Sequence, residues 1–478
     1  MRVDAIAWRC LFIALVVVTS ISTPVRSTAA GNSDTVLYSF CNAGNCASGT
    51  YPGPPIIDGA GNLVGTAAYG ANTQCAGGCG AAYLIAPNGT QTILHQFCSE
   101  TDCKDGANPG GLIETSPGIF YGATGYGGKN RNAGTVFRLT LKGKETVIYA
   151  FCSRRNCKDG SLPVSLILGA DGNFYGTTYA GGNTSVCSPG GCGTVFKLSP
   201  DGTETVLYSF CSQSNCADGM LPGGLLMGKD GNLYGETLYG GGTGCPEMTY
   251  GCGTLFKIAP DGTETVLHAF SGLGDGGLPD TLIADDSGNL YGETQLGGNS
   301  GCAGDGCGVV FQLTQDGTEN VLYAFGGSTD GAYPGGSLGI DGAGNLYGST
   351  GGGGTVHCKQ GKTLETEGCG VVFELAPNGT ETILYSFKGG EEDGAFPTGI
   401  VMDGSGTIYG STVEGGGGTN CYYYKKRSGC GTIFKLNSQQ MSSGSEWKLA
   451  RTSCSVAADL GVAWRGSDGI SLKARPCM

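Results

Sequence analysis

The feature that most restricts the fold of this chain is a repeated phrase, Val-Leu-Tyr-Ser-Phe. Its seven variant copies begin at Val36, Ile93, Val147, Val206, Val266, Val321 and Ile383. A second phrase, clearest as Asn-Leu-Tyr-Gly, and a third, clearest as Gly-Thr-Val-Phe-Lys-Leu, also occur seven times each and in a constant order. Such self-similarity indicates a tandem-repeat architecture.

Each repeat contains four candidate strands. In the fourth repeat these are residues 223–227, 232–237, 253–258 and 264–270, which are rich in branched and aromatic side chains. Asp-Gly and Asn-Gly pairs in the connections supply the positive φ of tight hairpin turns. Gly contributes 92 of 478 residues and charged residues only 14%, which suits short strands joined by turns. Four antiparallel strands per repeat are typical of a β-propeller blade.

The two ends of the repeat region indicate a closed ring. After residues 434–436 no copy of the first phrase follows, whereas an unaccompanied copy stands at residues 35–40. Pairing of this N-terminal strand with the last repeat would remove an exposed sheet edge. We therefore predict an all-β, seven-bladed β-propeller with four-stranded blades, whose last blade is closed by the N-terminal strand. The predicted domains are a signal peptide (1–30), the propeller (31–436) and a non-repeat C-terminal tail (437–478).

The N-terminus has the pattern of a secretory signal. Arg2 and Arg9 supply positive charge before an apolar run at residues 11–18, and Ala29-Ala30 offers a small-residue cleavage site. Because Cys10 precedes the apolar run, a lipoprotein signal is excluded. A retained membrane anchor is the alternative, although the run is short for a bilayer. We expect an extracellular or periplasmic protein with no membrane span in the mature chain.

Charge restricts the partners. Cleavage after Ala30 would leave 24 basic and 39 acidic residues, a net charge of −15. An acidic chain without a basic stretch argues against nucleic acid and anionic membranes as partners. Cations, basic partners and neutral glycans remain compatible with this charge.

The repeated phrases resemble the GloVer tandem repeat (Gloeobacter/Verrucomicrobia type). Residues 173–178 (Asn-Phe-Tyr-Gly-Thr-Thr) and 193–198 (Gly-Thr-Val-Phe-Lys-Leu) carry this resemblance, which extends over almost the whole mature chain. The resemblance implies an exported, propeller-like bacterial protein and brings no enzymatic activity with it. Because the sequence shows no C-terminal apolar sorting helix followed by basic residues, we expect a freely secreted or periplasmic form.

Apart from Cys10, the 22 cysteines form local pairs. One loop type, which leads from one blade to the next, holds Cys41/Cys46, Cys98/Cys103, Cys152/Cys157 and Cys211/Cys216. A second loop type, between the second and third strands of a blade, holds Cys75/Cys79, Cys187/Cys192, Cys245/Cys252, Cys302/Cys307, Cys358/Cys369 and Cys421/Cys430, and Cys454/Cys477 lie in the tail. An even number of cysteines in an exported chain indicates disulfides. Zinc binding is the alternative, but the chain has only three His and the pairs are present or absent as units.

In a four-stranded antiparallel blade both loop types emerge on the same face. We call this predicted surface the stapled face, and the short Asp-Gly turns lie on the opposite face. Preorganised loops on a rigid scaffold are where binding sites usually lie. The alternative is that the disulfides only protect glycine-rich loops from proteolysis.

The most regular polar feature of the stapled face is an aspartate in the motif Asp-Gly-x-x-Pro, just before each inner strand. The aspartates are Asp105, Asp159, Asp218, Asp275, Asp330 and Asp393, with Ser48 at the equivalent place in the first blade. In a closed ring we expect these six carboxylates near the channel rim, as ligand-binding residues for Ca²⁺ or for sugar hydroxyls. The alternative is that each aspartate only caps a turn.

Two further features break the sevenfold symmetry. Glu236 and Glu293 stand where other blades have Ala, Thr or Ser, and are candidates for general acid and base in glycoside cleavage. Two solvated strand glutamates are the alternative. Tyr422, Tyr423 and Tyr424, beside three basic residues, indicate contact of the last blade with an acidic glycan or a protein surface.

These observations favour a secreted, non-catalytic β-propeller that binds an extracellular glycan or protein through the stapled face, with no cofactor other than Ca²⁺. A polysaccharide lyase or glycoside hydrolase acting at the channel mouth is the second hypothesis. It rests mainly on what other propellers do, which is a weak basis for assigning activity. A Ca²⁺-dependent structural surface protein is the third.

Overall fold

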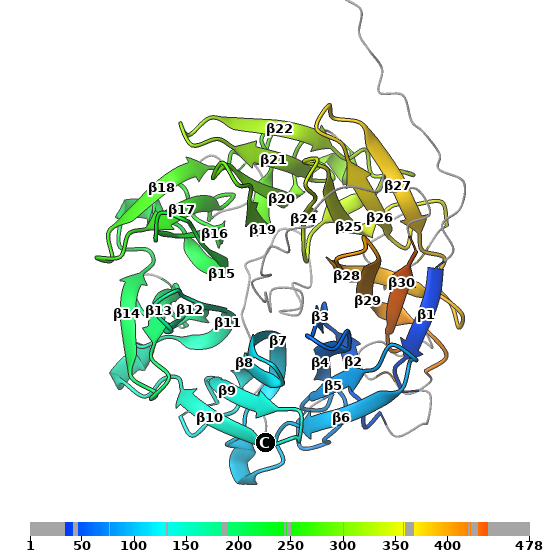
Figure 1. Cartoon of the computed structure of the whole chain (residues 1–478). Helices are drawn as coiled ribbons and strands as arrows, with labels where there is room; N and C mark the ends of the chain where they lie inside the picture. The colour runs from blue at the N-terminus through cyan, green and yellow to red at the C-terminus, as the bar shows by residue number, and fades with distance from the viewer. Residues whose placement is uncertain are drawn as a thin grey trace, which may run out of the picture.

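The computed structural model describes residues 34–437 except 42–45, 76, 131, 184–186, 188–189, 243–244, 246–249, 300, 357, 359–367, 419–420 and 422–428. Within these residues, thirty strands form seven antiparallel sheets around a central opening (Figure 1). The predicted seven-bladed β-propeller is therefore confirmed. The predictions for the signal peptide, for the tail with Cys454 and Cys477, and for Tyr422, Tyr423 and Tyr424 fall outside the described residues.

Each blade has four layers, counted outward from the central opening. The inner layer consists of β2 (Thr50–Pro52) continued by β3 (Ile56–Ile57), β7 (Ala107–Ser116), β11 (Ser161–Leu168), β15 (Met220–Met227), β19 (Gly277–Ala284), β23 (Ala332–Pro334) continued by β24 (Gly339–Ile340), and β28 (Gly394–Met402). The second layer consists of β4 (Leu63–Tyr69), β8 (Ile119–Tyr126), β12 (Phe174–Ala180), β16 (Leu233–Tyr239), β20 (Leu290–Leu296), β25 (Leu346–Gly352) and β29 (Ile408–Gly415).

The outer half of the blades is equally regular. The third layer consists of β5 (Ala81–Ile85), β9 (Thr135–Thr140), β13 (Thr194–Leu198), β17 (Thr254–Ile258), β21 (Val309–Leu313), β26 (Val371–Leu375) and β30 (Thr432–Leu436). The outermost layer consists of β6 (Gln91–Gln96), β10 (Glu145–Ala150), β14 (Glu204–Ser209), β18 (Glu264–Ala269), β22 (Glu319–Ala324), β27 (Glu381–Ser386) and β1 (Asp34–Ser39). In the described part of the chain, four 3₁₀ turns lie in loops: η1 (Thr101–Cys103), η2 (Arg155–Cys157), η3 (Ser214–Cys216) and η4 (Cys302–Gly304).

The ring is closed because the N-terminal strand completes the last blade. β1 pairs antiparallel with β30, with Val36 opposite Phe434, and completes the sheet β1-β30-β29-β28 (Figure 1). The pairing contains the same irregularity, after Val36, that β10 shows after Val147 in the second blade. The N-terminal strand thus occupies the place of a normal outermost strand, as predicted.

Neighbouring blades are joined by an aromatic ladder. A Phe that follows each outermost strand packs edge-on against an aromatic ring in the third strand of the next blade; Phe210 and Phe256, for example, have ring centroids 5.0 Å apart. The third-strand ring presses on the Gly of the Tyr-Gly phrase, since a Cβ on Gly235 would lie 2.5 Å from Cζ of Phe256. This contact explains why that position is Gly in all seven repeats. At the ring closure the corresponding ring contact is between Phe40 and Tyr83.

Candidate functional site

The two loop types do emerge together on one face. In the second blade the N–H of Gly128 donates to the carbonyl of Cys103 at 2.8 Å, and in the third blade Gly182 donates to Cys157 at 2.9 Å. Each blade-to-blade loop is therefore bonded to the second-to-third-strand loop of the blade that it enters. These contacts define the stapled face in the structure.

Ten disulfides lie within the described residues, and all are pairs predicted from the sequence. They join Cys41–Cys46, Cys75–Cys79, Cys98–Cys103, Cys152–Cys157, Cys187–Cys192, Cys211–Cys216, Cys245–Cys252, Cys302–Cys307, Cys358–Cys369 and Cys421–Cys430. Their presence is consistent with an oxidising environment.

Disulfides of adjacent loops also touch one another. The sulfur atoms of Cys75, Cys79, Cys98 and Cys103 all lie within 4.8 Å of one another. Because they are bonded in pairs, this group is two stacked disulfides and not a four-thiolate zinc site. A blade-to-blade loop is thus held on one side by a disulfide stack and on the other by backbone hydrogen bonds, which fixes the loops of the first two blades relative to each other.

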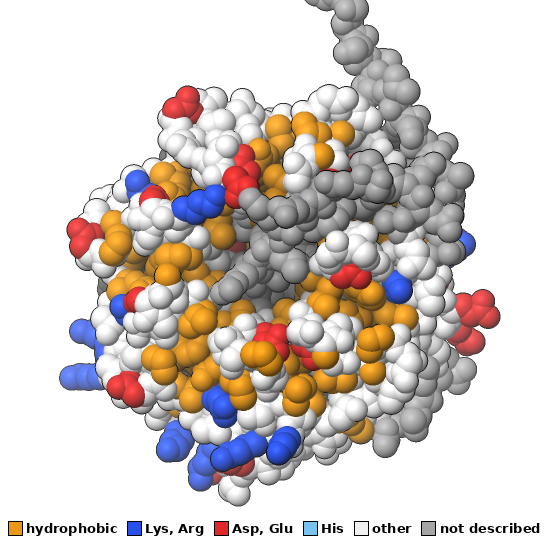
Figure 2. All heavy atoms as spheres, in the orientation of Figure 1, with side chains coloured by type: hydrophobic (Ala, Val, Ile, Leu, Met, Phe, Trp, Pro, Cys, Tyr) orange, Lys and Arg blue, Asp and Glu red, His pale blue; other side chains and the backbone are white. Residues whose placement is uncertain are grey.

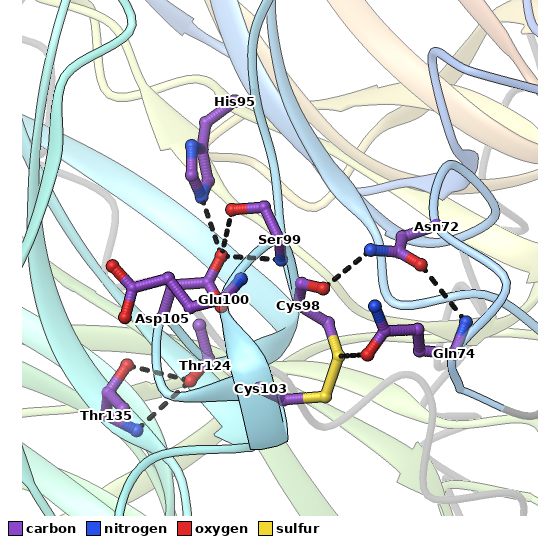
Figure 3. Close-up of polar contacts among 10 residues, drawn as sticks. All are labelled: Asn72, Gln74, His95, Cys98, Ser99, Glu100, Cys103, Asp105, Thr124 and Thr135. Carbon is purple, nitrogen blue, oxygen red and sulfur yellow. Dashed lines mark hydrogen bonds and ion pairs between the residues drawn. A yellow bond between two sulfur atoms is a disulfide. The ribbon is translucent and has the colours of Figure 1, made fainter.

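The repeated aspartates point into the blade-to-blade loops. The carboxylate of Asp105 is fully buried and accepts hydrogen bonds from Nε2 of His95 at 3.1 Å, from the backbone and hydroxyl of Ser99 at 2.9 and 2.8 Å, and from the N–H of Glu100 at 3.2 Å (Figure 3). Burial would raise the pKa of Asp105, but these hydrogen bonds outweigh it and lower the pKa below its ordinary value.

The other five aspartates repeat this geometry. Each accepts a hydrogen bond from an aromatic or imidazole side chain of the preceding outermost strand, in the pairs Tyr149–Asp159, Tyr208–Asp218, His268–Asp275, Tyr323–Asp330 and Tyr385–Asp393. We expected carboxylates open to a ligand at the channel rim. In the structure, however, the carboxylates accept hydrogen bonds from side chains and backbone N–H groups of the protein itself. A carboxylate that collects backbone N–H groups holds its loop in one conformation. The structure therefore shows the aspartates as loop caps, and ligand binding by them stays a prediction.

A second acid faces several of these aspartates from the start of the next outermost strand. Burial, together with the charges of Asp105 and Glu100, raises the pKa of Glu145 to about 8. Burial, together with the hydrogen bond and charge of Asp393, raises the pKa of Asp34 to about 8. Where the aspartate is replaced by Ser48, the facing acid is replaced by the neutral Gln91. The two positions thus change together, as expected if the paired acids share a proton.

A basic sector on the stapled face was missed from the sequence. Residues 104–158 contain nine Lys or Arg and three acids. Lys104, Lys129, Arg155 and Lys158 are exposed, come from three adjacent loops, and make no ion pair among the described residues. Figure 2 shows Lys and Arg side chains gathered along the part of the rim near β9 and β10. The basic residues of this sector are spread over three loops, so the sequence contains no contiguous basic run that would have indicated it.

Glu236 and Glu293 are not solvated, which corrects that alternative. They lie on β16 and β20, are 2% and 0% exposed, and belong to interfaces between blades. Burial and the negative charge of Asp280 raise the pKa of both well above the ordinary value. Asp280, on the inner strand β19, was missed from the sequence although most repeats have Gly at that position after the inner-strand Pro.

The fold and the loops define a seven-bladed β-propeller with a disulfide-bonded face. The chain belongs to the Gloeobacter/Verrucomicrobia repeat family, whose model matches residues 22–188 and 184–424. No curated protein sequence matches the chain. Within the residues that the structure describes, no helix is long and apolar enough to span a membrane.

Several solved structures are similar to the chain at low sequence identity. A fungal alcohol oxidase of the AA5 family, solved with copper, is 15% identical with a TM-score of 0.51, over 85% of this chain and 76% of the oxidase. An aldose sugar dehydrogenase from Streptomyces coelicolor is 12% identical with a TM-score of 0.40, over 86% and 99% of the two chains. A gluconolactonase from Xanthomonas campestris is 16% identical with a TM-score of 0.39, over 68% and 90%. At these identities the similarity carries no activity to this chain.

Proposed function

We propose that this protein is exported and acts without catalysis, binding an extracellular acidic glycan through the stapled face. The observation that carries the proposal is the basic sector formed by Lys104, Lys129, Arg155 and Lys158, which are exposed and unpaired among the described residues of an otherwise acidic chain. Lys and Arg bind carboxylate and sulfate groups through charge-assisted hydrogen bonds.

The loops that present these side chains support the proposal. Arg155 and Lys158 lie within or next to the loop closed by Cys152–Cys157, and Lys104 follows the loop closed by Cys98–Cys103. Preorganised loops reduce the entropy that is lost when a ligand binds. On the same face, at the fourth blade, Tyr250 and Leu273 are 52% and 61% exposed and offer an apolar surface for sugar rings.

The enzyme hypothesis is less well supported. Glu236 and Glu293 lie in blade interfaces, and Oε1 of Glu236 already accepts a hydrogen bond from the N–H of Gly224 at 2.5 Å. A general acid or base must come within hydrogen-bond distance of the substrate.

The test is retention of the purified, oxidised protein on a panel of immobilised polysaccharides, with new reducing or unsaturated ends measured in the same samples. We expect retention on polyuronates and sulfated glycans, weak retention on neutral glucans, and no new chain ends. The double variant Lys104→Glu/Lys158→Glu should lose retention. The matched control Lys142→Glu/Lys144→Glu changes the same charge in the β9–β10 turn on the opposite face. Equal losses in both variants, or new chain ends, would contradict the proposal, and stronger retention on DNA would redirect it to another polyanion.

A further inference from the structure

Two disulfides from opposite ends of the chain meet where the ring closes. Cys41–Cys46 lies in the loop that follows β1, and Cys421–Cys430 lies in the loop between β29 and β30. The sulfur atoms of Cys41, Cys46 and Cys430 all lie within 4.8 Å of one another. A sulfur of the last blade is therefore close to both sulfurs of the disulfide that follows the N-terminal strand.

The register of the closing strands explains this contact. Beyond the pairing of β1 with β30, the N–H of Phe40 donates to the carbonyl of Gly431 at 3.0 Å. The next two residues of an antiparallel pair continued in this direction are Cys41 and Cys430. The two cysteines thus lie opposite each other, although each is bonded within its own loop.

The third blade has the same arrangement. The N–H of Phe210 donates to the carbonyl of Gly193 at 3.1 Å, and Cys192 and Cys211 are the next two residues. Sγ of Cys187, the bonding partner of Cys192, lies 3.8 Å from Sγ of Cys211, although Cys187 and Cys211 belong to different disulfides. Contact between sulfurs of neighbouring disulfides is thus a repeated property of these loops.

Burial differs among the four cysteines of the ring closure. Cys41 and Cys430 are 3% and 0% exposed, whereas their bonding partners Cys46 and Cys421 are half-buried. The rate of thiol–disulfide exchange depends on access to the sulfur that is attacked. A thiol in solution can therefore reach Cys46 or Cys421 more readily than the two sulfurs that lie inside.

We propose that the ring closure is a site of thiol–disulfide exchange, which replaces the two local disulfides by a bond between Cys41 and Cys430. This bond would join the loop after β1 to the last blade and close the ring covalently. Because both of its sulfurs are buried, a thiol in solution would reduce it slowly. The site is independent of the proposed glycan binding.

The exchange proceeds in three steps. The thiolate of a low-molecular-weight thiol attacks Sγ of Cys421, and the electron pair of the broken bond leaves on the sulfur of Cys430. The Cys430 thiolate then attacks Sγ of Cys41, forms the new bond and releases Cys46 as a thiolate. A second small thiol attacks the mixed disulfide on Cys421, which frees Cys421 and yields the oxidised dimer of the small thiol. The two small thiols are oxidised, one protein disulfide is reduced, and the two protons end on Cys46 and Cys421.

The test uses the oxidised, folded full-length protein, incubated with reduced glutathione, alkylated, and digested with trypsin without reduction. Trypsin cleaves after Lys and Arg, so Cys421–Cys430 joins peptides 389–425 and 428–435. A Cys41–Cys430 bond instead joins peptide 428–435 to the peptide that ends at Lys104. We expect this second linkage to increase with time of incubation. The denatured, unreduced product should also migrate faster in a gel, because the long closed loop makes the unfolded chain more compact.

A pair of variants gives a second measurement. Cys46→Ser leaves Cys41 as a free thiol beside Cys430, so the Cys41–Cys430 linkage should form without added thiol. The matched control Cys157→Ser also frees one cysteine, Cys152, of a blade-to-blade loop. The second-to-third-strand loop of that blade, residues 127–134, contains no Cys, so Cys152 should remain a free thiol.

Two outcomes would overturn the proposal. One is that glutathione reduces both disulfides of the wild type and no linkage forms between peptide 428–435 and the peptide that ends at Lys104. The other is that Cys46→Ser folds with Cys421–Cys430 intact and Cys41 free. The measurement on the wild type does not depend on whether a variant folds. No glycan enters these measurements, so their failure is distinguishable from failure of glycan binding.

Discussion

Tyr83 is the one member of the aromatic ladder with a hydroxyl, and its removal should stabilise the protein. The other six blades have Phe at this third-strand position. Tyr83 is 0% exposed, and its hydroxyl has no hydrogen-bond partner among the described residues. The hydroxyl lies against Gly65, on which a Cβ would lie 2.6 Å from the oxygen. Tyr83→Phe would thus remove an unsatisfied polar group from the junction next to the ring closure.

The expected size of the effect follows from two opposing contributions. Relief of a buried, unsatisfied hydroxyl is worth about 1–3 kcal/mol. The space left by one oxygen atom costs roughly 0.5 kcal/mol. The net stabilisation should be about 0.5–2.5 kcal/mol, or a rise of roughly 1–3 °C in the thermal midpoint for a chain of this length.

The assay is thermal unfolding followed by circular dichroism, with the reverse change as the matched control. Phe137→Tyr places a hydroxyl in the second blade, where Cζ of Phe137 already lies 2.7 Å from the position of a Cβ on Gly122. That variant should be less stable by about 1–3 kcal/mol. A wild type more stable than Tyr83→Phe would refute the reasoning, because it would show that the hydroxyl has a partner such as an ordered water.

Three other perturbations test the loops and the acid pairs. Asp218→Ala leaves the hydroxyl of Tyr208 and two backbone N–H groups without their acceptor, and should cost about 2–4 kcal/mol in urea unfolding; no loss would mean that water replaces the carboxylate. Replacing Cys98 and Cys103 by Ser opens a loop with a sequence separation of 5 and should cost about 2 kcal/mol by the chain-entropy relation, measured at equal pH by the same method. Since the pKa of Glu145 is raised to about 8 from 4.5, the folded state holds the proton more tightly, and the resulting stability is full below about pH 4.5 and is lost as pH rises through 8. Stability should therefore fall between pH 5 and 9 by less in Glu145→Gln than in the wild type, the difference being on the order of 1–2 kcal/mol after allowance for solvent screening; equal pH profiles would contradict the shift.

Most of the fold could be predicted because each phrase recurs with its neighbours. The errors lie at strand ends. The inner strand of the fourth blade was predicted to begin at residue 223, but β15 begins at Met220 and runs through Pro222. Pro222 is accommodated because an inner strand borders the channel as an edge strand, where a missing N–H leaves no sheet bond unmade. Pro222 lies opposite Thr237 in the observed register.

The site was less predictable because its chemistry depends on which side chains meet across blades. The position of Asp105 follows from the repeat, but the direction of its carboxylate depends on donors at His95, Ser99 and Glu100. Glu236 was recognised as a break in symmetry, but the sequence did not show its burial. Both faces of a second strand are covered by the neighbouring blades, so a side chain on either face is buried. Asp280 gains its significance only from these neighbours, and no local motif marks it.

The short span of the disulfides has a consequence for how the chain matures. All ten join residues 4 to 11 positions apart, whereas Val36 must find Phe434 at the opposite end of the ring. Each bond can therefore form as soon as its own loop has been synthesised, with few competing partners nearby. The closing pairing has to wait for the last repeat and bears most of the loop-closure entropy. Until then both β1 and the open edge of the last blade are free to pair with the corresponding edges of another chain, so a domain-swapped dimer is the characteristic misassembly expected at high concentration.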